Sequence, residues 1–330
     1  MVAAEIAEDK VGALAAAIRS LEEGLASLRL ALQTSKKEEA AKQAEILGNR
    51  EDLGRLLATL IALQNTPAEL SVLHPEGATA SARAGAMLST VSPALRAKAD
   101  SLRRELTSLS ALNILHDNAL ANTQIALGIL QTARNALAVA LRQEQPIVDT
   151  LVPQAGLAQL ARASSDLNTL AAALNDRFPT GAQLEAVGTL QGRVPMPLIG
   201  TISRRFNQPN GAGISQPGIV VTAPALSLIT APQAGVVRFS GDFLEYGLVV
   251  ILEPTPNQLH IYAGFGQVYV KVGEVLESGA AMGLLGGEMP DSAEFLAESG
   301  SENDKGSESL YIEIRENGMP VDPETWFATN

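Results

Sequence analysis

The sequence predicts an α + β multidomain protein: a long antiparallel coiled-coil hairpin followed by an all-β domain. Two leucine-rich runs of similar length carry heptad spacing and are separated by helix breakers. From about Gly192, glycine, proline and β-branched residues replace the heptads. We therefore expect a hairpin over 1–145, a linker with a short helix over 146–190, and a β domain over 191–330.

The hairpin prediction rests on leucines that alternate steps of three and four. The first run would form its seam from Leu14, Ile18, Leu21, Leu25, Leu28 and Leu32, and again from Ile46, Leu53, Leu57 and Leu60. The second run holds two registers, Leu95, Leu102, Leu106 and Leu109, then Leu120, Leu127, Leu130, Leu137 and Leu141. Breakers at 65–67 and 74–77 favour a hairpin, although two helices of a bundle or parallel coils of a dimer also fit. A rod has no pocket, so partners would bind its tip, near 68–87, or its flanks.

Leucines in the linker, namely Leu157, Leu160, Leu167, Leu170 and Leu174, predict one amphipathic helix that ends near Phe178. It is too short to pair with the rod and too apolar to be solvated, so it must lie against another surface.

Composition excludes several classes of function. A net charge of -12 argues against nucleic acid and gives no general attraction to anionic lipid. The absence of cysteine excludes disulfides, thiolate zinc sites and cysteine nucleophiles. No apolar run reaches membrane-spanning length, and the first residues do not resemble a signal peptide. We expect either a cytosolic protein or a periplasmic one whose signal peptide has been removed.

The β-rich half resembles the LytM, or M23, peptidase family over nearly all of 195–327. The resemblance is carried by the order of Ala231–Val237, Tyr246–Val250, Val272–Val275 and Tyr311–Gly318 with Val321-Asp322-Pro323. Active members bind zinc through H-x-G-[apolar]-D and the last His of H-x-H, with a further His after a strand Tyr. At these ligand and base positions the present sequence has Gln216, Val220, Ser309, Tyr311 and Gly264. The resemblance therefore implies a peptidase-shaped domain with no metal and no catalysis.

Residue chemistry independently disfavours an enzyme. Hydrolytic zinc needs three protein ligands, and His260 is the β domain's one histidine. We expect His260 to be an ordinary strand residue and assign Glu313 no general-base role. The sequence has no G-x-S-x-G motif, so it offers no nucleophilic serine elbow. It also has no glycine-rich, phosphate-binding loop before a predicted helix.

A heptad rod followed by a degenerate LytM domain is similar to the EnvC-type family of murein hydrolase activators. The resemblance implies a periplasmic protein that acts in cell division, held through its rod by FtsX of the FtsEX complex. Its cleft would bind the regulatory helix of a zinc-dependent cell-wall amidase, through Val220, Tyr246, Val249, Tyr262, Tyr311 and Arg315. Val220 and Val249 also suit an ordinary core.

The same resemblance implies that a segment of the chain covers the cleft at rest. Two segments are candidates: the helix over 157–178 and the acidic, glycine-rich stretch 286–309, which also reads as a solvated loop.

Three alternatives stay open at this point. A periplasmic adaptor of an export pump also combines a helical hairpin with β elements, but there the hairpin interrupts the β module. A zinc endopeptidase with unusual ligands would bind stoichiometric metal. A passive scaffold would bind peptidoglycan without an amidase.

Overall fold

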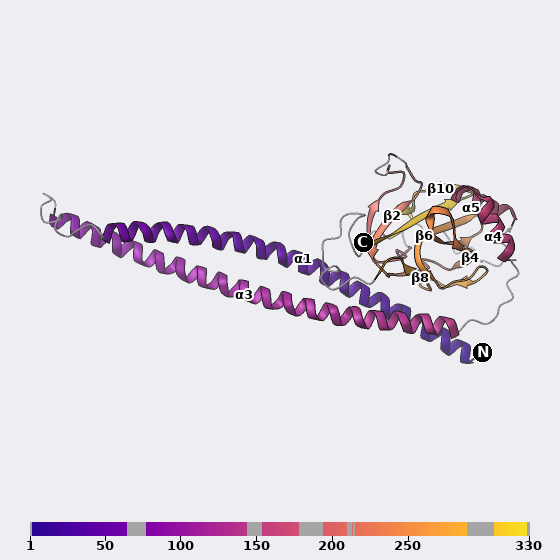
Figure 1. Ribbon diagram of the computed structural model, residues 1–330, viewed down its shortest axis with the longest axis horizontal. Coiled ribbons are helices and arrows are strands. Elements are labelled where there is room, and N and C mark those ends of the chain that lie inside the picture. The colour runs from indigo at the N-terminus through magenta and orange to yellow at the C-terminus, as the bar shows by residue number, and fades with distance from the viewer. Residues whose placement is uncertain are drawn as a thin grey trace. The chain divides into compact units, whose positions relative to one another are not determined.

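The structure is a computed structural model that describes residues 2–64, 77–143, 154–177, 194–209, 213, 215–288 and 307–328 (Figure 1). Its contacts divide the chain into two compact units, 30–121 and a larger unit that joins 1–29 to 122–330. The larger unit therefore holds the base of the helical hairpin together with the β domain. Among the described residues, no helix is long and apolar enough to cross a membrane.

Two long helices form the predicted hairpin, α1 (Val2–Gln64) and α3 (Gly77–Gln143). Glu22 of α1 pairs with Arg134 of α3, and farther along α1 Asn49 bonds to Glu105 of α3. Because the contact in α3 moves backward as that in α1 moves forward, the helices are antiparallel, as predicted. Most of the described seam is buried at least in part, and the most enclosed members are Ile18, Leu25, Leu32, Ile46, Leu127, Leu130 and Leu137.

Leu106 is the seam prediction that the structure contradicts, since it is 50% exposed. Glu105 takes the inward place beside it, where its carboxylate accepts hydrogen bonds from Asn49 of α1 (3.2 Å) and from Ser101 (3.0 Å). A polar pair thus interrupts the leucine seam. The breakers at 65–67 and 74–76, and the side chains of Leu53, Leu57, Leu60 and Leu95, lie outside the described residues.

In the part of the β domain that the structure describes, ten strands pair antiparallel, which confirms the all-β prediction. Seven follow one another in the order β1-β2-β9-β6-β5-β4-β7, while β10 pairs with β9 and a β3–β8 pair joins β6. Their bounds are β1 (Thr201–Arg204), β2 (Ile219–Pro224), β3 (Leu228–Thr230), β4 (Gly235–Asp242), β5 (Leu248–Thr255), β6 (Gln258–Val268), β7 (Val275–Leu276), β8 (Ala281–Leu285), β9 (Ser307–Glu316) and β10 (Met319–Val321). Short 3-10 helices, η1 (Leu244–Tyr246) and η2 (Pro323–Thr325), precede β5 and follow β10.

Alternation along the strands gives this sheet two buried faces. On one face, Ile219, Val250 and Ile312 join a core with the β3–β8 pair and Trp326. On the other, Val220, Val249 and Tyr311, among others, are covered by α4 (Gln154–Ala163) and α5 (Leu167–Arg177). We call this second surface the helix-covered face.

The linker helix expected as one piece is two helices. Ser164 turns its hydroxyl back to the carbonyl of Leu160 (2.8 Å), and Asp166 then caps α5 by accepting from the backbone N–H of Thr169 (2.7 Å). The Asp166 N–H in turn donates to Thr169 Oγ1 (3.2 Å), so the two residues cap each other. Ser-Ser-Asp therefore ends one helix and begins the next, which lets both apolar sides face the sheet.

Candidate functional site

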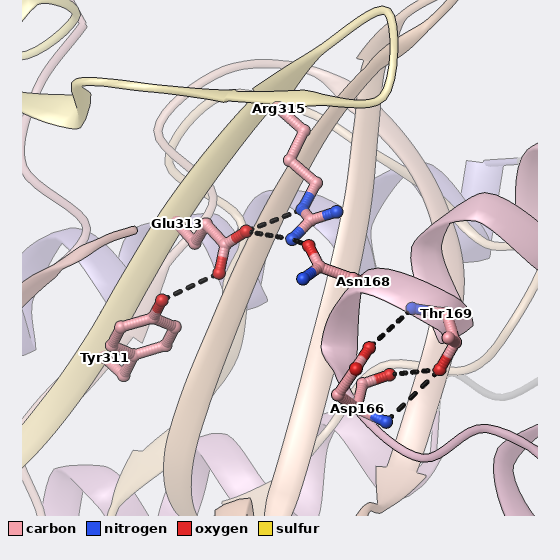
Figure 2. A network of polar contacts seen from close by, with 6 residues as sticks. All are labelled: Asp166, Asn168, Thr169, Tyr311, Glu313 and Arg315. Atoms are coloured by element: carbon pink, nitrogen blue, oxygen red, sulfur yellow. Dashed lines mark hydrogen bonds and ion pairs between the residues drawn. The ribbon is translucent and has the colours of Figure 1, made fainter. Parts of the chain in front are cut away.

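A row of polar side chains runs along β9 on the helix-covered face (Figure 2). Tyr311 donates its hydroxyl proton to Glu313 Oε2 (2.7 Å), and Arg315 Nε donates to Glu313 Oε1 (2.6 Å). Residues two apart on a strand point to the same side, so this row is a direct consequence of the Tyr-x-Glu-x-Arg spacing. All three are buried, with Arg315 at 3% exposure and Glu313 at 1%.

Burial sets the protonation of this row. Desolvation raises the pKa of Glu313, although the Arg315 guanidinium and the Tyr311 hydroxyl oppose that rise. Desolvation likewise raises the pKa of Tyr311, and the neighbouring Glu313 carboxyl raises it further. Tyr311 is therefore a neutral hydrogen-bond donor, and its oxygen is not available as a phenolate.

Helix α5 is held at its N-terminal end by this row. Asn168 in its first turn accepts a hydrogen bond from Arg315 Nη2, so the guanidinium bridges Glu313 of the sheet and Asn168 of the helix (Figure 2). Charge-assisted bonds of this kind are stronger than neutral ones.

A second arginine holds the other end of α5. Arg238 of β4 donates from Nη2 to the carbonyl of Leu174 (3.2 Å) and pairs through Nη1 with Glu253 of β5. A cation at the last turn satisfies a helix-end carbonyl and complements the helix dipole. The sheet thus contributes one guanidinium to each end of the helix.

Apolar packing fills the space between the two arginines. On α5, Leu167, Leu170, Ala171 and Leu174 are all at most 3% exposed, and Leu157 and Leu160 of α4 are at most 4% exposed. They share one core with residues of β2, β4, β5, β6 and β9, among them Val220, Phe239, Val249, Ile251, Leu259, Ile261, Ala263 and Tyr311. The prediction that this amphipathic segment must lie against another surface is confirmed.

A hollow of about 640 Å³ opens beside the cover and gathers all five positions expected to have lost zinc ligands or bases. Gln216, Val220, Gly264, Ser309 and Tyr311 line it together with Tyr246, Ser165 and Asp166.

The side chains in this hollow do not fit a zinc ion. Val220 has no donor atom, the Gln216 Oε1 oxygen accepts from Arg204 Nη2 (3.0 Å), and the Tyr311 hydroxyl is bonded to Glu313. Hydrolytic zinc is held by three imidazole, thiolate or carboxylate ligands. Among the residues that the structure describes, no three His, Cys, Asp or Glu side chains lie together in such a group.

Two glycines set the shape of the hollow. A Cβ on Gly218 would lie 2.6 Å from the Tyr311 ring, so glycine at this position lets the ring lie against β2. Gly264 has a φ of +113°, and a Cβ there would lie 2.4 Å from the carbonyl oxygen of Ser309. A histidine side chain at position 264 would therefore require another backbone conformation.

Five of the six predicted groove residues lie on the helix-covered face. Val220, Val249, Tyr311 and Arg315 are buried under or beside the cover, and Tyr246 is half-buried with its ring centroid 6.0 Å from that of Tyr311. Tyr262 does not join them.

The reason is the parity of β6, which sends Ala263 to the helix-covered face and Tyr262 to the opposite core. There the Tyr262 hydroxyl bonds to His260 Nδ1 (3.2 Å). His260 is fully buried beside Trp326, and this burial lowers its pKa to about 3.

Sequence reasoning missed the contacts that orient α5. Arg238 and Glu253 are charged residues in strands whose other members are mostly apolar, and in the sequence this contrast could have indicated a buried ion pair. Asn168 carried no signal. The other proposed cover, 286–309, lies almost entirely outside the described residues, which resume at 307.

Comparison with known proteins agrees with this geometry. Residues 215–323 match the model of Peptidase family M23. An uncharacterized protein of Neisseria meningitidis serogroup B is 30% identical over 138 residues, which cover 42% of this chain and 20% of that protein. Murein hydrolase activator EnvC of Escherichia coli K12 is 26% identical over 142 residues, 43% of this chain and 30% of that one. The matched region is thus less than a third of the length of either relative.

Among solved structures, Csd3 of Helicobacter pylori is 22% identical with a TM-score of 0.32, over 42% of this chain and 35% of that chain. A zinc-containing peptidase of Vibrio cholerae is 16% identical with a TM-score of 0.33, over 42% and 40%. By sequence, residues 215–323 are similar to Peptidase family M23, in a chain that is similar over 43% of its length to murein hydrolase activator EnvC of Escherichia coli.

Proposed function

We propose that this protein is a non-catalytic activator of a zinc-dependent cell-wall (N-acetylmuramoyl-L-alanine) amidase in the periplasm. Its helix-covered face binds a regulatory helix of the amidase after α4 and α5 have moved away. FtsX recruits the protein through the coiled-coil hairpin and, with FtsE, switches it during cell division. The role of the Escherichia coli relative EnvC, a murein hydrolase activator, supports this proposal.

One observation carries the proposal: an amphipathic helix of the chain itself lies across a sheet face that borders the hollow. That hollow gathers the five positions at which the family resemblance implies lost zinc ligands or bases. A helix in an apolar groove is a recurrent mode of recognition. The contacts of α5 indicate what such a surface selects. Such a surface selects a helix with three features: a hydrogen-bond acceptor in its first turn for Arg315, apolar residues three and four apart, and a last-turn carbonyl that accepts from Arg238.

An amidase helix with the same features would compete with α5 for the same contacts. The cover then acts as an inhibitor, because the face binds only one helix at a time. The side chains at the zinc positions favour binding over hydrolysis, since Val220 and Tyr311 supply an apolar wall and a neutral hydroxyl.

The contact between Arg315 and Asn168 offers a test in which one bond is broken from either side. Asn168→Ala removes it from the cover and leaves the face intact, so amidase activation should rise. Arg315→Gln removes it from the face that the amidase needs, so activation should fall. Dye release from purified sacculi by a purified periplasmic amidase, with the full chain added, measures both.

Opposite signs for these two variants support the proposal. A fall in both, or no change in either, contradicts it, provided that thermal melting shows both to be folded. The passive-scaffold alternative predicts that the chain sediments with sacculi and leaves amidase activity unchanged. The pump-adaptor alternative predicts no effect on sacculi at all.

A further inference from the structure

One carboxylate at the base of the hairpin contacts three separate elements. Glu22 Oε1 accepts a hydrogen bond from Arg134 Nη2 of α3 (2.7 Å) and another from the backbone N–H of Leu228 in β3 (3.0 Å). Both charged side chains are enclosed, at 6% exposure for Glu22 and 5% for Arg134. These residues belong to the compact unit that joins 1–29 to 122–330.

A neighbouring arginine adds to this contact. Arg19, one turn before Glu22, donates to Thr230 Oγ1 (2.7 Å) and to the carbonyl of Met196 (2.6 Å). Ile18 beside it is fully buried. The base of α1 therefore binds the first and last residues of β3 as well as the chain that leads into β1.

The partner on the β side is a buried backbone N–H at the edge of a strand. β3 is a three-residue strand that pairs with β8, and the N–H of Leu228 is satisfied by Glu22 and not by another strand. An unpaired edge N–H must find an acceptor when it is buried, and Leu228 is 2% exposed. The carboxylate of α1 supplies that acceptor.

Arg134 is what makes this arrangement possible. A buried carboxylate needs a charge partner, and Arg134 supplies it for Glu22. Within the described structure, neither the second carboxylate oxygen of Glu22 nor Arg134 Nε has a hydrogen-bond partner, so the pair depends on this one contact between Arg134 Nη2 and Glu22 Oε1. Separation of α3 from α1 at this level would remove the ion pair of Glu22 and leave Arg19, on α1 itself, as the neighbouring positive charge. The carboxylate would then turn to water and release Leu228.

We propose that Glu22 is a latch that docks the β domain on the base of the hairpin only while α1 and α3 are paired there. Hairpin pairing and domain docking are then one coupled equilibrium, so a partner that shifts α3 against α1 also frees the β3 edge. The latch lies on α1 and β3, apart from the helix-covered face, and needs no amidase to be observed.

A charge swap separates this latch from a simple helix–helix ion pair. In the double variant Glu22→Arg with Arg134→Glu, the pair between the helices is restored, but arginine offers no acceptor to the Leu228 N–H. The latch predicts that the swap restores hairpin stability without restoring docking. A purely structural pair predicts that the swap restores both.

Two readouts measure docking in the full chain. Hydrogen exchange of peptides that cover β3 reports the Leu228 N–H. Because the chain has no cysteine, spin labels at Ser27→Cys and Glu277→Cys report the hairpin–domain distance alone. Glu22→Ala and Arg134→Met should each speed β3 exchange at least tenfold and broaden the distance distribution, whereas Glu23→Ala, on the exposed side of the same turn, should change neither.

Exchange of α1 and α3 peptides shows whether the hairpin itself is intact in each variant. Should a variant fail to fold, Thr230→Val leaves Glu22 and Arg134 in place. It removes the bond from Arg19 to Thr230 Oγ1, together with the bond from that hydroxyl to the carbonyl of Pro197 (3.2 Å), and should broaden the distance distribution with the hairpin unchanged. Full β3 protection in Glu22→Ala or in the charge swap would overturn the proposal.

Discussion

Leu170→Ala is the sharpest test of the cover. Leu170 is fully buried at the middle of α5, in the core that this helix shares with the sheet. Truncation of a buried leucine to alanine costs about 2–5 kcal/mol, from lost transfer energy and from the cavity left behind. Since about 1.4 kcal/mol is a factor of ten, the ratio of covered to uncovered chains should fall by roughly 30-fold at the low end of that range.

Amide exchange of α5 measures this shift directly, and dye release from sacculi by an amidase measures its consequence. We expect exchange in the 166–177 segment to speed by at least that factor while β5 and β9 keep their protection. Amidase activation should rise in parallel. The face itself is unaltered, because Leu170 belongs to the cover and not to the sheet.

A matched control separates packing from helix formation. Ala172 is exposed on the same helix, and Ala172→Gly lowers helix propensity by about 1 kcal/mol without removing an apolar contact with the sheet. Its effect should therefore be smaller than that of Leu170→Ala. Equal effects would mean that local helix stability, not docking, controls the cover. Unchanged α5 exchange in Leu170→Ala would refute the reasoning outright.

Three further outcomes follow from single positions. Because the pKa of His260 is lowered to about 3, only the unfolded chain takes up its proton below pH 6.5, so the unfolding free energy should fall by up to about 1.4 kcal/mol per pH unit from 6.5 toward 3. Urea titrations should show this slope weakened in His260→Gln and kept in His116→Gln. Gly218→Ala should lower the melting temperature, since its Cβ meets the Tyr311 ring at 2.6 Å, while Gly54→Ala on α1, with open space around it, should raise helix stability by about 1 kcal/mol. The dialysed full chain should hold no stoichiometric zinc by mass spectrometry, and one bound zinc per chain would contradict the donor set at 216, 220 and 311.

Periodicity in the sequence predicted the hairpin and the β domain because both depend on patterns that repeat over many residues. The a/d seam was sufficient to predict helices α1 and α3. It failed at Leu106, which the seam places inward and the structure leaves exposed. Glu105 occupies the inward place there because Asn49, 56 residues away in the sequence, offers it a hydrogen bond. A local pattern carries no information on such a distant partner.

The same limit of local patterns explains which residues of the candidate site could be predicted and which could not. Tyr311, Glu313 and Arg315 lie on one side of β9, as their spacing and the period of a strand require. Tyr262 was assigned to the groove by analogy with a motif, and the parity of β6 sends it to the other core. Two aromatic residues of the face, Phe239 and Phe243, look like ordinary core residues in the sequence, and only the sheet order brings them under α4 and α5.

The latch and the cover act on opposite layers of one β domain. Glu22 contacts β3, whose residues join the core with Trp326, whereas α5 contacts the helix-covered face. Residues 144–153 connect α3 to α4, and ten residues span at most about 36 Å.

While the latch is closed, we expect a displacement of the hairpin to move the β domain with it. Helices α4 and α5 then do not move relative to the sheet that they cover. Once Leu228 is released, we expect the same displacement to separate α3 from the domain and so to act on α4, which follows α3 along the chain. Glu22→Ala should therefore leave α5 protected in the isolated chain, since its own contacts are intact, yet reduce the displacement of the hairpin needed to expose the face. Loss of α5 protection in Glu22→Ala alone would mean that latch and cover are one cooperative unit and not two steps in sequence.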